Sequence, residues 1–218
     1  MSILTKEQKL FLGLFSKDKI LSSGFYLTGG TALAEFYIPY RYSDDLDFFS
    51  EEEVDTQGIL PSIKKYKTKL GHKNIEFNTS FNRNLFFLDF GENYTLKIEF
   101  TYFPFPQIEK KKPVNGLVVD SALDIAVNKL FTIYQKPRSR DFMDLYMLNK
   151  EYGYKMDGLV SKARSKFDWH IDPVKLGSQF LLAIELKDYP KLLKPMKEKE
   201  WQDYFVNEAK NLGKDVFK

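Results

Sequence analysis

The sequence predicts an α+β protein in which a mixed sheet with flanking helices is followed by a mostly helical C-terminal part. Runs that alternate between apolar and polar residues, the pattern of half-buried strands, fall within about the first 105 residues. From Ser121 onward the apolar residues recur at helical spacing. A proline-rich loop around Pro104–Pro113 separates the two patterns. We therefore expect an α/β core over residues 1–110 and a helical region over residues 111–218.

The composition is that of a globular protein with an aromatic core. Hydrophobic residues make up 43% of the 218, and 16% are aromatic. The net charge of +3 permits a nucleotide or nucleic-acid partner without requiring one. With no cysteine and only His72 and His170, the chain lacks the means for disulfides, thiolate zinc sites and histidine metal sites. No signal peptide or membrane-length apolar run is found, so we expect a cytoplasmic protein without a membrane partner.

The first part of the chain alternates between helices and strands. Leu10, Phe11, Leu14 and Phe15 form one apolar side of an N-terminal helix. The tripeptide "GEN" is a plausible hairpin turn between two of the strands. The other expected elements are a strand over 24–28, a helix over 31–38, a strand over 45–49, a lysine-rich helix over 61–70, strands in "NIEFNTS", "NLFFLDF" and "YTLKIEFTYF", and a short strand in "GLVVD".

The second part has two well-marked helices, over 121–135 and 139–152, with Pro137 between them. Ser121 and Asp124 come close to a capping box at the start of the first. From Asp157 onward the pattern stays helical, and Trp169 and Trp201 are its expected anchors.

Two aspartates near the start of the chain have the spacing of a metal site. In a strand, residues two apart share a face, so Asp45 and Asp47 project together while Leu46 and Phe48 point into the core. Asp44 would point to the opposite face and is set aside. Two adjacent carboxylates repel each other unless a cation lies between them, and oxygen ligands favour a hard ion such as Mg²⁺. An exposed acidic loop would explain the Asp-Leu-Asp sequence equally simply.

A glycine pair precedes these acids. Gly29 and Gly30 lie between a strand and the helix that contains Thr31, where free N–H groups and the helix dipole favour an anion such as phosphate. A tight strand-to-helix turn is the simpler explanation of a glycine pair taken alone. A triphosphate at the glycines would place its metal at the acids, so the order and spacing of the two motifs are more specific than either.

A third carboxylate would complete such a site. Glu99 lies in a long apolar run, which indicates a central strand, and Glu76 is the competing candidate. If the Glu99 strand lies beside that of Asp45 and Asp47, Glu99 can bind metal or take a proton from an attacking hydroxyl.

"GGTAL" followed by "RYSDDLDFF" resembles the signature of the nucleotidyltransferase superfamily, and in detail it looks like the AbiEii/AbiGii-type toxin family. That family also carries a lysine followed about a dozen residues later by Arg-Asp-x-x-Asp-Leu, matched here by Lys129 and by "RDFMDL" from Arg140. The resemblance covers about residues 24–148 and implies a nucleotidyltransferase-like core whose site the helical region completes.

The resemblance also implies roles for individual residues. Lys129 would bind triphosphate as a point charge, although a lysine on a generic helix faces solvent. Asp141 would orient Lys129 or act at the substrate, Arg140 would pair with a carboxylate or phosphate, and Arg41 and Ser43 would contact phosphates from the loop before the acids. The predicted catalytic residues are Asp45, Asp47, Glu99, Lys129 and Asp141; the predicted nucleotide-binding residues are Gly29, Gly30, Thr31, Arg41, Ser43 and Lys129; the predicted metal ligands are Asp45, Asp47 and Glu99.

The resulting functional hypothesis is a Mg²⁺- or Mn²⁺-dependent transfer of NMP from an NTP to an acceptor hydroxyl. The resemblance implies a toxin of a toxin–antitoxin or phage-defence (abortive infection) pair, with tRNA as acceptor and an antitoxin protein as a possible partner. Two alternatives stay open: a nucleotidyltransferase that modifies a small molecule such as an aminoglycoside, and a nucleotide-binding module without turnover.

Overall fold

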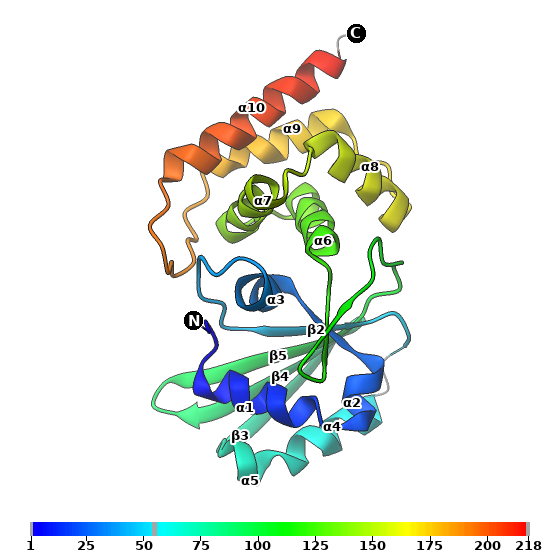
Figure 1. Ribbon diagram of the computed structural model, residues 1–218, viewed down its shortest axis with the longest axis vertical. Coiled ribbons are helices and arrows are strands. Elements are labelled where there is room, and N and C mark those ends of the chain that lie inside the picture. Colours follow the sequence, from blue (N-terminus) through cyan, green and yellow to red (C-terminus); the bar gives the residue numbers. More distant parts are fainter. Residues whose placement is uncertain (1, 54–55, 217–218) are drawn as a thin grey trace. The chain divides into compact units, whose positions relative to one another are not determined.

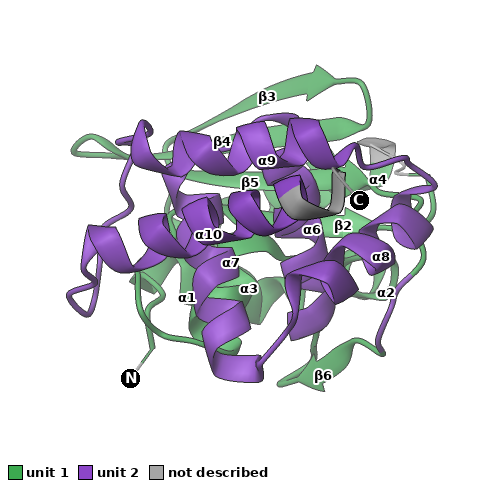
Figure 2. Ribbon diagram, turned by 90° about the horizontal axis from the view of Figure 1, so that it is seen from above, with its two compact units in different colours: residues 1–106, 110–121 green, residues 107–109, 122–218 purple. Residues whose placement is uncertain are grey.

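The computed structural model describes residues 2–53 and 56–216, and the chain divides into two compact units (Figure 2). Unit 1 comprises Met1–Pro106 and Lys110–Ser121. Unit 2 comprises Gln107–Glu109 and Ala122–Lys218. Each unit is described below by itself.

Unit 1 is built on one mixed sheet, which confirms the predicted fold class. In the described part of the chain its order is β3-β4-β5-β2-β1-β7-β6. The β2–β5 and β1–β7 pairs are parallel and the other pairs are antiparallel. The strands are β1 (Tyr26–Thr28), β2 (Leu46–Ser50), β3 (Asn74–Ser80), β4 (Arg83–Gly91), β5 (Tyr94–Tyr102), β6 (Lys112–Val114) and β7 (Leu117–Val119).

Helices cover both faces of this sheet, and α1 and α3 lie on opposite sides of β2 (Figure 1). A capping box between Thr5 and Gln8 starts α1. Its buried side differs from the predicted one: Leu12 is buried, whereas Leu10 is exposed. The helices of unit 1 are α1 (Lys6–Phe15), α2 (Lys19–Gly24), α3 (Gly29–Phe36), α4 (Thr56–Lys65) and α5 (Lys67–Leu70).

Stacked aromatic rings join α1 to the sheet, as the composition predicts. The ring of Phe15 stacks on Phe48 with centroids 4.3 Å apart, and Phe48 stacks on Phe100 at 5.1 Å. All three side chains are buried. Because side chains alternate along a strand, this apolar face leaves the opposite face of β2 and β5 for polar residues.

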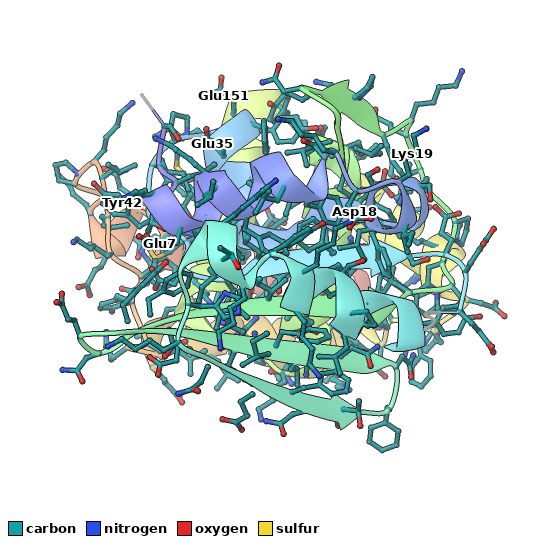
Figure 3. The ribbon with its side chains drawn as sticks, turned by 90° about the horizontal axis from the view of Figure 1, so that it is seen from below. Glu7, Asp18, Lys19, Glu35, Tyr42 and Glu151 are labelled. Atoms are coloured by element: carbon teal, nitrogen blue, oxygen red, sulfur yellow. The ribbon has the colours of Figure 1, made fainter. Side chains whose placement is uncertain are left out.

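Polar contacts fix the ends of the helices on the α1 side of unit 1, the side seen in Figure 3. Asp18, labelled there, accepts hydrogen bonds at Oδ1 from the backbone N–H groups of Ile20 and Leu21 and so caps α2. Its Oδ2 accepts one from the hydroxyl of Tyr66 at 2.8 Å. Glu35 holds the N-terminal segment by accepting from the backbone N–H of Ile3.

The hairpins of unit 1 use left-handed turn residues. The predicted "GEN" turn is confirmed, with Glu92 and Asn93 at φ 51° and 61° as a type I′ turn requires. A second turn, at Asn115 and Gly116, joins β6 to β7 and was missed. Since β7 pairs with β1 through Leu27 and Val119, this hairpin belongs to the sheet, and unit 1 extends beyond residue 110.

Unit 2 is helical in the described residues apart from short connections. The predicted helices over 121–135 and 139–152 are present as α6 and α7, but one predicted anchor is wrong: Trp201 is buried against Phe142, whereas Trp169 is 55% exposed. Among the described residues, no helix is long and apolar enough to cross a membrane. The helices are α6 (Ala122–Gln135), α7 (Ser139–Tyr152), α8 (Met156–Phe167), α9 (Pro173–Leu181), the 3₁₀ helix η1 (Leu182–Ile184) and α10 (Glu198–Val216).

Candidate active site

The acids of unit 1 gather on the polar face of β2 and β5. Asp47 and Glu99 are register partners in these parallel strands, so they lie side by side, as predicted for Glu99. The strand begins at Leu46, so Asp45 lies in the preceding loop rather than in the strand as expected. The competing acid, Glu76, lies on the edge strand β3.

The glycine pair brings the start of α3 against these acids. A Cβ atom on Gly29 would lie 2.5 Å from Oδ2 of Asp47, and Gly29 has a φ of +71°. A Cβ on Gly30 would overlap the guanidinium of Arg41 and lie 2.9 Å from the hydroxyl of Ser43. The space that the glycines leave is therefore filled by an acid, a guanidinium and a hydroxyl.

Hydrogen bonds hold the backbone of the loop that contains Ser43, Asp44 and Asp45. The hydroxyl of Thr31, a buried side chain, donates to the carbonyl of Asp45. The amide of Gln8 donates to the carbonyls of Ser43 and Asp44 at 2.8 and 3.0 Å. These bonds fix the backbone that presents Asp45.

Arg83 and Lys97, which the sequence analysis did not predict, form ion pairs with the acids Glu99 and Asp45. Arg83 holds Glu99 in a bidentate pair, with Nε–Oε1 and Nη2–Oε2 distances of 2.6 and 2.7 Å. Lys97 lies 3.3 Å from Asp45 and 3.4 Å from Glu99. Lys97 carried a local signal, since it is two residues from Glu99 on the same strand. Arg83 did not, because its position depends on the register of β4 with β5.

These partners set the charge of Glu99. Burial by itself would raise the pKa of this carboxyl, but the hydrogen bonds and charge of Arg83, together with Lys97 and the hydroxyl of Thr101, hold the pKa below its usual value. Glu99 is therefore ionised at neutral pH.

Unit 2 contains a second charged cluster, centred on Lys129. Its Nζ lies 2.7 Å from Oδ1 of Asp141 and 2.7 Å from Oδ2 of Asp144. The side chain is buried, unlike that of a lysine on a generic helix, and it joins α6 to α7. Arg138, which the sequence reading did not single out, also binds Asp141, at 2.9 Å and three residues away.

Asp141 is ionised in the folded protein. Burial would raise the pKa of Asp141, but the charges of Lys129 and Arg138 and their hydrogen bonds hold it below its usual value. The predicted orientation of Lys129 by Asp141 thus has a direct geometric basis.

A further buried ion pair ties α6 to α8. Lys166 Nζ lies 2.7 Å from Oδ1 of Asp124, and both side chains are buried. The carboxylate of Asp124 also accepts from the backbone N–H groups of Ile108 and Glu109, each at 2.9 Å. It therefore fastens the short segment 107–109 to the helices of unit 2.

The structure brings the predicted residues together in two groups. Gly29, Gly30, Thr31, Arg41, Ser43, Asp45, Asp47 and Glu99 lie in unit 1, and Lys129 and Asp141 in unit 2.

The donors of unit 1 fit a hard divalent cation. Within the described residues no three His, Cys, Asp or Glu side chains are placed to hold a metal together. Asp45 and Asp47 offer carboxylate oxygens, and a Mg²⁺ held by one or two carboxylates takes its remaining ligands from phosphate and water. The ammonium of Lys97 lies between Asp45 and Glu99, so these two carboxylates already share a cation of the protein itself.

Comparison with known proteins finds a matching family and a relative of similar sequence. A family model described as "Nucleotidyl transferase AbiEii toxin, Type IV TA system" matches residues 14–217. The uncharacterized protein aq_aa25 of Aquifex aeolicus (strain VF5) is 31% identical over 173 residues, 77% of this chain and 77% of that protein.

Two solved structures from Helicobacter pylori share the fold. One, provisionally described as a nucleotidyltransferase, has a TM-score of 0.63 and 23% identity, and covers 98% of this chain and 97% of its own. The other, JHP933, has a TM-score of 0.62 and 22% identity, and covers 98% and 94%.

Proposed function

The chain belongs to the nucleotidyl transferase AbiEii toxin family of type IV toxin–antitoxin systems, and on this premise we propose a specific reaction and site for it. The protein moves a nucleoside monophosphate from an NTP to an acceptor hydroxyl, with Asp45 and Asp47 holding Mg²⁺ or Mn²⁺. The observation that carries this proposal is the close packing of the Gly29–Gly30 helix start against Asp47, beside Glu99.

The triphosphate binds at the start of α3. The N-terminal N–H groups of that helix favour an anion, and Arg41 and Ser43 stand over Gly30 to contact phosphate oxygens. Thr31 acts indirectly, by holding the carbonyl of Asp45. The role of Lys129 as a point charge for the triphosphate stays a prediction; within unit 2 its ammonium lies 2.7 Å from the carboxylate of Asp141.

In the reaction, the acceptor hydroxyl gives its proton to solvent, its oxygen bonds to the α-phosphorus, the bond from that phosphorus to the bridging oxygen breaks, and pyrophosphate leaves. The divalent ion, when bound, supplies neutralisation of the triphosphate charge. Glu99 is engaged by Arg83, so its first role here is to position that guanidinium beside Asp47. Its roles as third ligand or as proton acceptor stay predictions.

The acceptor that we propose is tRNA, and the biological role is that of a toxin in a phage-defence system with an antitoxin partner. The family description supports the toxin role. A small-molecule acceptor is the competing outcome of the experiment below.

The experiment follows a label from NTP to acceptor. The protein is incubated with each α-³²P-labelled NTP, Mg²⁺ and either total RNA, total protein or an aminoglycoside. We expect label in the tRNA fraction, and we expect Asp47→Asn to lower the rate by about 100-fold or more, because the site loses a metal-binding charge.

Asp44→Asn is the matched control, because Asp44 is the exposed neighbour of the predicted ligands. It should keep full activity and the same melting temperature. Undiminished transfer by Asp47→Asn would overturn the assignment of the site, whereas label in an aminoglycoside would overturn only the proposed acceptor.

A further inference from the structure

Unit 2 has a cavity that the proposed reaction does not use. It has a volume of ≈ 370 Å³ and lies where the last turns of α7 meet the start of α8 and the middle of α10. Its walls include Tyr146, Tyr154 and Tyr204. We call it the tyrosine pocket. Its volume falls in the range of small-molecule sites.

The tyrosine rings form flat, rigid walls. Tyr146 and Tyr204 meet edge to face, with centroids 5.5 Å apart and planes at 62°. Tyr154 is held from behind by Tyr152, which stacks on it at 5.4 Å with an interplanar angle of 14°. Rings fixed in this way lose little freedom when a flat ligand stacks on them, and stacking of a nucleobase on an aromatic side chain contributes about 1–3 kcal/mol.

A buried amide in the wall has an unused polar atom. Asn149 is 7% exposed, and its Nδ2 donates to the hydroxyl of Tyr204 at 2.8 Å. Its Oδ1 has no hydrogen-bond partner among the described residues. Leaving a buried acceptor unpaired costs about 1–3 kcal/mol, and because this oxygen has almost no exposed surface, a ligand N–H reaches it only when the side chain of Asn149 turns toward the pocket. The edge of a nucleobase carries such donors.

The rim of the pocket carries both signs of charge. Lys150 and Lys155 are exposed lining residues, and the ammonium of Lys150 lies 5.6 Å from the centroid of the Tyr146 ring. Phosphate is the anion that such a lysine pair attracts. Glu208 lines the same pocket; burial and the charge of Asp157 raise its pKa, whereas the charge of Lys155 lowers it.

Burial raises the pKa of both Tyr154 and Tyr204 to about 12. Both hydroxyls therefore keep their protons at neutral pH and can serve as hydrogen-bond donors to a ligand.

We propose that the tyrosine pocket binds one nucleotide, with its base between the tyrosine walls and its phosphate at Lys150 and Lys155. The nucleotide is either free or an unpaired residue of an RNA strand, since both present the same base and phosphate. This binding site goes beyond the proposed transfer reaction, which assigns to α7 only Asp141 near its start.

The test is a binding measurement that needs no transfer. Equilibrium dialysis in EDTA follows each of the four labelled 5′-monophosphates and a labelled single-stranded RNA of about twelve nucleotides. We expect binding that Tyr154→Ala weakens by about tenfold, the loss of one stacking contact. Tyr154→Phe keeps the ring and should keep most of the binding, which separates stacking from a folding defect.

Matched controls lie outside the pocket on the same unit. The two controls are Tyr189→Ala, which removes another partly exposed tyrosine, and Lys162→Ala, which removes an exposed lysine of α8. The test variant is Lys150→Ala, which removes a lysine from the rim of the pocket. Only the last should weaken binding and flatten its salt dependence.

Binding of the monophosphates identifies a free-nucleotide site, and binding of RNA alone identifies a strand site. The proposal is overturned if neither ligand binds at about 1 mM, or if Tyr154→Ala binds as well as the wild type. Because no NTP or metal is present, failure of this test leaves the proposed transfer reaction standing, and failure of the transfer reaction leaves this proposal standing.

Discussion

The charged clusters of the two units differ in how far water reaches them. In unit 1 the side chains of Arg83 and Lys97 are 52% and 25% exposed. In unit 2 the side chain of Lys129 is 11% exposed, and those of Asp141 and Asp144 are fully buried. Water-exposed ion pairs contribute little and exchange partners readily, whereas buried charges are costly unless every partner is present.

This difference indicates a division of work. Arg83 and Lys97 can leave the acids at low cost, because water can solvate their charges. The buried pairs of unit 2 cannot rearrange cheaply, so they hold Lys129 and the segment 107–109 in fixed positions. The charged side chains of the unit 1 cluster can therefore change partners, whereas those of the unit 2 cluster keep fixed positions.

The largest expected effect is the loss of a buried pair. Lys166→Met removes the ammonium that pairs with the buried carboxylate of Asp124, so we expect the free energy of unfolding to fall by about 3–5 kcal/mol. Urea denaturation measures it. Lys162→Met, at an exposed position of the same helix, should change stability by about 0.5 kcal/mol or less. Equal effects of the two variants would remove the distinction drawn between the clusters.

A smaller effect is expected at the glycine pair of unit 1. Gly29→Ala puts a side chain at φ +71°, which costs about 1–2 kcal/mol, and its Cβ would displace Asp47. Gly71→Ala is the matched control, with φ +79° and nothing within 4 Å of its Cβ. Both variants should lose similar stability, but only Gly29→Ala should lose NMP transfer, as measured with labelled NTP. Full transfer by Gly29→Ala would mean that Asp47 need not sit against α3.

Local patterns predicted much of this structure. The alternation around Asp47 and the helical spacing of 121–135 and 139–152 identified a strand and two helices because each depends on neighbouring residues. Asp141 and Asp144, three residues apart on α7, share one helix face, and both bind Lys129.

What the sequence left undetermined depends on pairing between distant segments. Arg83 reaches Glu99 only because β4 and β5 pair in one register, and a shift of one residue would turn it to the other face. Trp201 is buried on α10, whereas Trp169 lies in the connection between α8 and α9 and is exposed, a difference that depends on how distant segments of unit 2 pack. The Asn115–Gly116 hairpin had a local signal, since Asn-Gly is a strong type I′ turn, and that signal was overlooked.

The smallest expected effect concerns the Arg83–Glu99 pair and its dependence on pH. The folded-state pKa of Glu99 lies below its usual value, so the pair contributes stability above the unfolded pKa, about 4.3, and loses it as the pH falls through the folded pKa. In Arg83→Gln, the guanidinium no longer offsets the effect of burial on Glu99, so the folded-state pKa of Glu99 rises. Because Arg83 is half exposed, we expect a loss of only about 1 kcal/mol at pH 7, which shrinks as the pH falls through this range.

Urea denaturation of the wild type and Arg83→Gln from pH 7 down to acid conditions measures this difference. Lys199→Gln, which breaks the exposed i, i+4 pair with Asp203, is the control and should show little loss at any pH. If Arg83→Gln lost the same free energy at every pH, the guanidinium would act through packing rather than charge. The cations of unit 1 would then be fixed parts of the sheet face, and the contrast with the buried cluster of unit 2 would fail.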